Sequence, residues 1–281
     1  MPDIYGSHFE FGGVSSRQYG LILAGVDADR FLNLHGEIEG NTMFLKTAKK
    51  NFLISDDYSG SPVEFELDIV FEEDKPIMQA DRREIEKWLF GSRRYRKLYL
   101  DAADDPFMET GEYINGELKR LYLNCRFMEP EKIEGFGNVF GYHVKAECDS
   151  PFMWQDPVTY TWYGDTTQQT SANFVIDVDS DLDDYIYPQV TVRTGGTAGG
   201  VGGFTFTAYN ATDDATRLTE ITDISAQTNV VMDGEVNYIS NDYFLKFNHP
   251  NFIRLLDGEN VIHITGTLEY VRFTFSQRRL F

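Results

Sequence analysis

The clearest candidate for chemistry is the alternating aspartates of Asp177–Asp184, which read Asp-Val-Asp-Ser-Asp-Leu-Asp-Asp. Hard cations prefer several carboxylate oxygens, so this spacing resembles the start of a calcium loop. The EF-hand version fails, because Leu182 stands where glycine is needed and Pro188 where a bidentate glutamate is needed. We therefore interpret the stretch as an acidic surface loop or strand edge, and we predict no bound metal.

A second candidate is the glycine-rich stretch Thr194–Gly203, whose composition resembles a phosphate-binding loop. Such a loop needs a helix N-terminus behind it and usually a lysine or hydroxyl residue at fixed spacing. Here the strand-like run Phe204–Ala208 follows, and no lysine is near. A flexible connection between two strands is the favoured interpretation, and no cofactor is predicted.

Catalytic patterns are missing from the sequence. There is no HxxxH or HExxH spacing and no Gly-x-Ser-x-Gly elbow. His143 and Cys148 are five residues apart on one predicted strand, so they point to opposite faces and form no dyad. Glu64, Glu66 and Asp68 fit the wet side of an amphipathic strand better than a glycosidase pair. The chain is predicted not to be an enzyme.

Three aromatic residues near the middle of the chain, Trp154, Trp162 and Tyr163, could stack on sugar rings. In a β-rich protein such residues more often pack in a core or a domain seam. They are the only candidate binding residues, as a possible glycan-stacking site.

The elements that would position these residues differ between the two halves. In the first half, apolar residues alternate with polar ones in Val63–Phe71, Leu121–Phe127 and Tyr142–Cys148, which predicts strands with one buried face. A helix is predicted from about Asp81 to Phe90, capped by Asp81 and ended by Gly91. One helix lying against a sheet is the resulting prediction.

After Pro151 the composition shifts to Thr, Gly and Asp, and lysine nearly vanishes. Short strands separated by turn residues predict an antiparallel sandwich. Val261–Thr265, Gly266-Thr267 and Leu268–Phe275 together predict a terminal hairpin. The other predicted strands are 190–193, 204–208, 230–232 and 244–247, and the last hairpin strand is centred on 271–275. We predict a mainly β protein with domains 1–151 and 152–281.

Charge and cysteine usage narrow the function classes. The 281 residues carry a formal net charge of -20, which disfavours nucleic acid and anionic lipid as adhesive partners. Residues 1–151 hold 18 basic and 28 acidic residues, and the remainder 7 and 17, so no basic domain is hidden. No apolar run approaches membrane-spanning length, and no secretory signal is predicted. Cys125 and Cys148 are expected to be buried free thiols.

Several segments, in order, resemble the distal tail protein family of long-tailed bacteriophages. The opening Phe9–Ser16, followed by Tyr19-Gly20-Leu21, is similar to the family's start, with Gly12 in place of its usual Asn. Cys148–Phe152 closes the first domain much as the family's Cys-x-x-Pro segment does. Leu256–Asn260, with the strand after it, is similar to the C-terminal signature.

Further points of the resemblance are mixed. The strand Val63–Phe71 and the helix ending Trp88-Leu89 match in order and spacing. Asp105-Pro106, with Tyr113 after it, resembles the family's hairpin arm. The family's Gly-Arg-x-Gly element is missing, since this chain has only Gly40-Asn41-Thr42.

The resemblance implies a ring of six copies built by the first domain, and an outward galectin-like sandwich in the second. The protein would be a tail-tip or baseplate hub that joins the tail tube protein to a tail-associated hub protein and receptor-binding proteins. It would belong to a phage or prophage virion, assembled in bacterial cytoplasm, with DNA passing through the lumen without specific binding. An acidic lumen would repel that DNA. The alternative is a carbohydrate-binding, adhesin-like protein that recognises cell-surface glycans.

Overall fold

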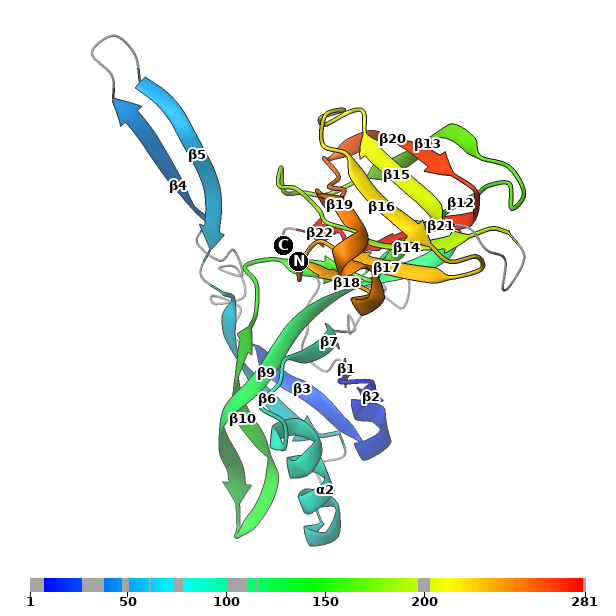
Figure 1. Ribbon diagram of the computed structural model, residues 1–281. Coiled ribbons are helices and arrows are strands. Elements are labelled where there is room, and N and C mark those ends of the chain that lie inside the picture. Colours follow the sequence, from blue (N-terminus) through cyan, green and yellow to red (C-terminus); the bar gives the residue numbers. More distant parts are fainter. Residues whose placement is uncertain are drawn as a thin grey trace. The chain divides into compact units, whose positions relative to one another are not determined.

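The computed structural model describes residues 8–26, 38–46, 51–60, 62–72, 78–100, 111–114, 116–196 and 203–279. It forms two compact units, the first of residues 1–155 and 279–281, and the second of residues 156–278. Strands dominate both units, and α2 (Gln79–Phe90) is the only α-helix in the described part of the chain (Figure 1). The predicted fold class, a β-rich domain with one helix plus an antiparallel sandwich, is confirmed.

The first unit is built on one large antiparallel sheet whose main path runs β2-β1-β7-β9-β10-β6-β3. β11 and β8 add to β9, and β22 (Arg278–Arg279) adds to β11. β4 and β5 pair with each other as a separate hairpin. The strands of this unit are β1 (Phe9–Phe11), β2 (Val14–Ser15), β3 (Leu21–Val26), β4 (Ile38–Lys46), β5 (Asn51–Gly60), β6 (Glu64–Phe71), β7 (Arg96–Leu100), β8 (Gly111–Ile114), β9 (Glu117–Gly135), β10 (Asn138–Cys148) and β11 (Met153–Gln155).

The strand predictions of the first half are confirmed, since Val63–Phe71 becomes β6 and the other two runs lie within β9 and β10. The helix begins two residues earlier than predicted, at Gln79. Asp81 is therefore inside the first turn, and the capping residue is Met78, which makes no side-chain capping bond. The predicted cap was wrong, whereas Gly91 ends the helix as expected.

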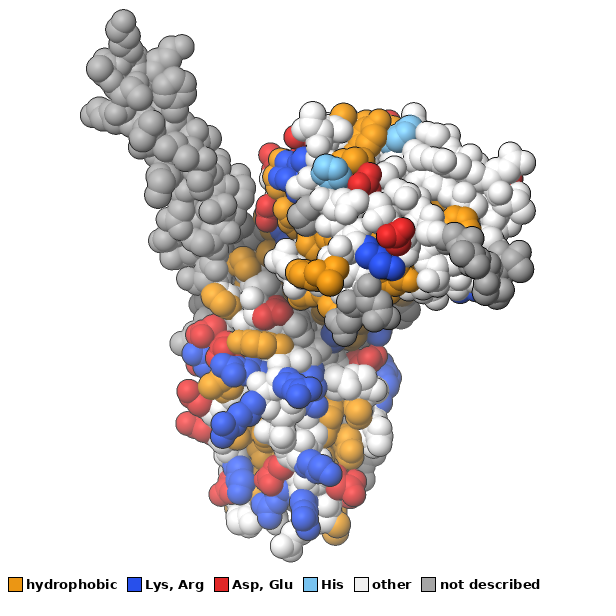
Figure 2. Space-filling view, viewed as in Figure 1, with side chains coloured by type: hydrophobic (Ala, Val, Ile, Leu, Met, Phe, Trp, Pro, Cys, Tyr) orange, Lys and Arg blue, Asp and Glu red, His pale blue; other side chains and the backbone are white. Residues whose placement is uncertain are grey.

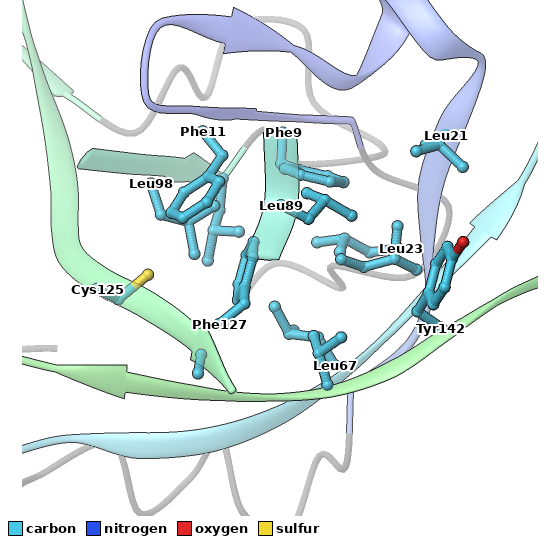
Figure 3. Packing of buried hydrophobic residues seen from close by; sticks show 14 of the residues in the cluster. Phe9, Phe11, Leu21, Leu23, Leu67, Leu89, Leu98, Cys125, Phe127 and Tyr142 are labelled. Carbon is cyan, nitrogen blue, oxygen red and sulfur yellow. The ribbon is translucent and has the colours of Figure 1, made fainter. Parts of the chain in front are cut away.

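The core of the first unit lies between α2 and the sheet (Figure 3). Ile85, Trp88 and Leu89 are the buried residues of the helix. The Trp88 ring stacks on Phe9 with 5.8 Å between centroids, and its indole nitrogen donates to the Phe11 carbonyl at 2.9 Å. Phe9 and Phe11 are buried and alternate with the half-buried Glu10, so one face of the short strand β1 packs in the core beneath the helix.

The second unit is a sandwich of two five-stranded antiparallel sheets, ordered β12-β21-β14-β17-β18 and β13-β20-β15-β16-β19. Most strands of this unit bury alternate residues between the sheets, which is the pattern that predicted a sandwich. Its strands are β12 (Val158–Tyr163), β13 (Thr170–Val178), β14 (Gln189–Thr194), β15 (Phe204–Asn210), β16 (Thr219–Ile224), β17 (Asn229–Asp233), β18 (Tyr238–Ile239), β19 (Phe247–Pro250), β20 (Gly258–Gly266) and β21 (Leu268–Phe275).

The predicted terminal hairpin was wrong, although both of its strands exist. β20 pairs with β13 and β15, whereas β21 pairs with β12 and β14 in the other sheet. The short Gly266-Thr267 connection therefore crosses from one sheet to the other. A side chain at Gly266 would put Cβ 3.0 Å from the Thr205 carbonyl oxygen, so the crossing needs glycine at this close approach.

One strand prediction in the second half was also wrong. Phe244–Lys246 belong to the 3-10 helix η2 (Asn241–Lys246), and only Phe247 of the predicted run lies in a strand. Phe244 and Leu245 are both exposed, so their apolar character did not report a buried strand face. Among the described residues, we find no helix with the length and hydropathy that crossing a bilayer would require.

Candidate assembly surfaces

The predicted glycan-stacking residues are divided between the two units. Trp154 lies in β11 of the first unit, where its ring packs edge-on against Phe152 at 4.9 Å. Trp162 and Tyr163 are consecutive residues of β12, so they point to opposite faces of its sheet. Tyr163 is 72% exposed, while the Trp162 ring lies close to Gly164. Their role in stacking on sugar stays a prediction.

The other candidates for chemistry fall in ordinary positions. Asp177 is in β13, and Asp179–Asp184 form the irregular connection after it, where the Asp184 carboxylate pairs with Arg278 at 2.7 Å. Across the described ranges, no three His, Cys, Asp or Glu side chains are arranged to hold a metal ion. Residues 197–202 of the glycine-rich stretch lie outside the described residues, and the strand β15 follows it, as predicted.

Cys125 and Cys148 are both free and buried, as predicted, and they lie opposite each other on β9 and β10. Burial, together with a hydrogen bond that the Cys125 thiol donates to Cys148, raises the pKa of Cys125 well above its ordinary value. His143 is on the other face of β10, where its Nδ1 lies 2.6 Å from the Asp68 carboxylate. His143 and Cys148 therefore do not form a catalytic pair, as their odd spacing along one strand predicted.

The C-terminal motif Leu256–Asn260 has a clear structural role in the second unit. Asn260 is fully buried, and its Oδ1 accepts from the Leu256 amide at 2.9 Å and from the Asn210 side-chain nitrogen at 2.8 Å. Its Nδ2 donates to the carbonyls of Leu256 and Gly258 at 2.7 and 2.9 Å. This amide holds the turn that starts β20 and ties it to the end of β15.

The first unit presents a sheet edge at β3. Within the described part of the chain, β3 pairs with β6 and with no other strand. Leu21 and Leu23 are buried on one face, so the strand is firmly attached to the core. An edge strand with unpaired backbone groups is a template for another strand.

The β9–β10 hairpin ends in the turn Gly135-Phe136-Gly137, whose central residue is the most exposed aromatic of the described chain. Phe136 has a relative exposure of 106% and a left-handed φ of 50°. The acidic residues Glu129, Glu131 and Glu134 are exposed on the β9 side of the hairpin, and Lys132 is the only Lys or Arg of residues 129–138. Among the described contacts, neither Glu131 nor Glu134 makes an ion pair. The hairpin is thus an acidic arm with an apolar tip.

A basic surface lies on the same unit, on α2 and the loop to β7. Residues 79–97 hold seven Lys or Arg and three Asp or Glu, in a chain whose net charge is -20. Four of the basic side chains are exposed and make no ion pair with any described residue; they are Arg83, Lys87, Arg93 and Arg94. We call these four residues the basic surface. Sequence reasoning missed it, because only the sum over each half was considered.

The second unit has an outward sheet face of a different kind. Asn173, His263 and Tyr209 stand opposite one another on β13, β20 and β15. The Tyr209 and His263 rings stack at 4.9 Å, and the two ring nitrogens of His263 lie 2.8 Å from Asn173 Oδ1 and 3.0 Å from Ser171 Oγ. The row is polar and aromatic, and it was not among the predicted binding residues.

Comparison with known proteins shows which family the chain belongs to. Residues 4–150 match the family model described as the phage tail protein N-terminal domain. That match covers more than half of the 281 residues, so the chain belongs to this phage tail protein family. No curated protein matches the chain.

Solved structures show which fold this phage tail protein has. It is similar to the Dit protein of phage SPP1, described as a paradigm of hub adsorption apparatus in phages that infect Gram-positive hosts, with a TM-score of 0.57 and 11% identity. The likeness covers 98% of this chain and 99% of the SPP1 chain. A chain of the activated phage p2 baseplate is similar at a TM-score of 0.49 and 7% identity, over 96% of this chain and 98% of that one. The resemblance to a distal tail protein is confirmed at the level of the fold.

Proposed function

We propose that the protein is the distal tail hub of a bacteriophage or prophage, a hexameric ring at the tail tip or baseplate. The single observation that carries this proposal is that the likeness to SPP1 Dit extends over 98% of the chain and so includes both units. A family match limited to the N-terminal domain would leave the sandwich without a role.

In this proposal each domain has its own task. Residues 1–151 form the ring, and the open edge of β3 supports assembly by strand pairing between copies. Residues 152–281 form the galectin-like sandwich. The ring joins the tail tube protein to a tail-associated hub protein and to receptor-binding proteins, within a virion assembled in bacterial cytoplasm. DNA passes through the lumen without specific binding, and the role is structural rather than enzymatic.

The experiment that tests this function is a solution mass by light scattering over a concentration series, with negative-stain imaging of the same sample. A six-fold ring with a central hole is the expected result. A monomer at every concentration, both alone and mixed with the tail tube protein of the same phage, would contradict the ring. A map of the ring at side-chain resolution tests the acidic lumen, because a channel lined by Lys and Arg would refute it.

A second candidate function is glycan recognition by the second unit. It is favoured by the polar row of Asn173, His263 and Tyr209, in which hydrogen-bonding groups lie beside an aromatic ring. Neutral sugars are bound by such combinations of stacking and directed hydrogen bonds. Binding of the intact protein to neutral bacterial cell-wall polysaccharide, measured by calorimetry, tests it. Binding that survives Tyr209→Ala but is lost in Tyr163→Ala would move the site to the predicted residue.

A further inference from the structure

We propose that the acidic β9–β10 hairpin of one copy docks on the basic surface of the next copy. The basic surface is Arg83, Lys87, Arg93 and Arg94, and the docking element is the arm that carries Glu131, Glu134 and Phe136. This inference rests on the proposed ring and names a second contact between neighbouring copies, beside the strand pairing at β3. The occupant is therefore a second copy of this chain.

Charge is the first argument. Among the described residues, none makes an ion pair with Arg83, Lys87, Arg93 or Arg94, although the chain holds 45 acidic residues against 25 basic ones. Glu131 and Glu134 are likewise exposed and unpaired among the described residues. Oppositely charged, unpaired surfaces on one chain attract each other between copies, and like-charged alternatives are suppressed.

The exposed phenylalanine is the second argument. Phe136 is fully exposed and held between Gly135 and Gly137 at a left-handed φ of 50°, a conformation that phenylalanine rarely adopts. An aromatic side chain presented at a tight turn gains from burial in a partner, since aromatic anchors dominate protein interfaces. The acidic arm then supplies the polar rim around this anchor.

Placement within the unit is the third argument. Tyr142 of β10 contacts α2, where its hydroxyl donates to Glu86 at 3.1 Å and its ring packs on Phe90 at 5.5 Å. Tyr142 stands opposite Lys132, so the turn at Phe136 extends past this contact. Figure 1 shows this turn and α2 at the same end of the first unit, as two separate features. Two different surfaces at one end of a subunit suit a head-to-tail contact, and such a contact builds a ring when the rotation between copies closes.

Crosslinking in trans tests the contact directly. Asn138→Cys is placed beside the hairpin tip and Glu84→Cys on α2, both exposed positions that leave the proposed charges and Phe136 intact. Cys125 and Cys148 are buried and do not compete for a short bismaleimide. The variant with both new cysteines is expected to give a ladder that ends at the closed ring, whereas each single variant gives at most dimers.

Charge exchange supplies the second measurement. Glu131→Lys with Glu134→Lys, or Arg93→Glu with Arg94→Glu, is expected to lower ring formation at least about tenfold. Mixing the two variants should restore it, because the reversed hairpin meets the reversed basic surface and the other two partners are native. Asp177→Lys with Glu259→Lys in the second unit changes the net charge as the hairpin variant does, and it should leave ring formation unchanged.

Three results would overturn the inference. A wild-type ring that gives no ladder from the double-cysteine variant rejects this contact and leaves the hub function standing. Assembly that is absent in wild type and variants at every concentration rejects the contact and the ring together. Retention of short duplex DNA that disappears in Arg93→Glu with Arg94→Glu, while ring formation is unchanged, assigns the basic surface to nucleic acid instead.

Discussion

The two units cover the apolar faces of their sheets in different ways. The second unit closes its sheets face to face, so its apolar side chains are covered from within the chain. The first unit lays one helix on a single large sheet and leaves β3 at the end of the strand order. The first unit holds 47 charged residues in 158 positions and the second 23 in 123, so the first has the more charged surface. Figure 2 shows blue and red side chains spread over the first unit and mostly uncharged atoms on the visible face of the second.

This difference separates the unit that we propose to bind other copies from the unit whose sheets cover each other. A sandwich covers the apolar faces of its two sheets within one chain, and its fewer charges offer fewer ion pairs to neighbouring copies. A sheet with an open edge is a template for a strand of another copy, which is the assembly proposed for the first unit. Substitutions that act on only one unit can separate the two roles.

The largest expected effect comes from removing the anchor of the first unit. Trp88→Ala deletes a ring that is only 8% exposed, stacks on Phe9 and Tyr19, and donates to the Phe11 carbonyl. We expect a loss of about 3–5 kcal/mol in the free energy of unfolding of the first unit. Calorimetry should show that unit's transition move down while the transition of the second unit stays in place.

Trp88→Phe is the matched control for this substitution. It keeps an aromatic ring in the core and removes the indole hydrogen bond, so the expected loss is smaller, about 1–2 kcal/mol. Equal shifts of both transitions in Trp88→Ala would show that the units unfold together, and the comparison between them would not hold.

The next effect belongs to the second unit. Asn260→Ala leaves the Leu256 amide and carbonyl and the Asn210 side chain without their buried partner. Because unsatisfied buried polar groups are costly, we expect a loss of about 2–4 kcal/mol, confined to the second transition. Asn248→Ala is the control, since Asn248 bonds at the surface to Glu220 and should cost less than about 0.5 kcal/mol. Comparable losses in urea unfolding of the two variants would contradict this role of Asn260.

Alternation of apolar and polar residues predicted most of the strands. The main error concerned which strands pair with one another. Alternation in Val63–Phe71 fixed a buried face because a strand has period two, and it predicted β6 to within one residue. The same alternation in Leu268–Phe275 said nothing about which strand lies beside it. A short Gly-Thr connection fits a hairpin and a crossing between sheets equally well, so β20 and β21 were wrongly paired.

The candidate surfaces were harder to predict for a related reason. Phe136 between two glycines reads as a turn, but exposure of its ring depends on how far the hairpin extends past α2. The basic surface combines residues of a helix face with residues of the loop after it. No periodic pattern in the sequence shows that these residues lie together. Asn260 was part of the resemblance to the family, yet its four hydrogen bonds appear only when β15 and the turn before β20 come together.

A smaller effect separates two kinds of ion pair. Arg254 donates to both carboxylate oxygens of Asp213 at 2.7 and 3.0 Å, lies 3.7 Å above the Tyr185 ring, and faces a carboxylate that is only 8% exposed. Lysine cannot reproduce the planar fork, so Arg254→Lys should cost about 1–2 kcal/mol in the second unit. Arg193→Lys, at the more exposed pair with Glu269, should cost less. A larger loss at Arg193, measured by urea unfolding, would reverse this order.

The smallest effect sharpens the comparison by its dependence on pH. The Glu147 carboxylate of the first unit accepts from the Tyr95 hydroxyl and from Arg126, each at 2.7 Å, and these bonds, that of Tyr95 foremost, lower its pKa. A lowered folded-state pKa stabilises the protein above the ordinary value of 4.5 and loses this contribution as pH falls through the folded value. Glu147→Gln should therefore cost less than about 1 kcal/mol at neutral pH, and the deficit should shrink on acidification. Urea midpoints of the first unit measured across this range test the sign, and a deficit that grows as the pH falls would mean that the carboxylate is not held in its charged form by Tyr95 and Arg126.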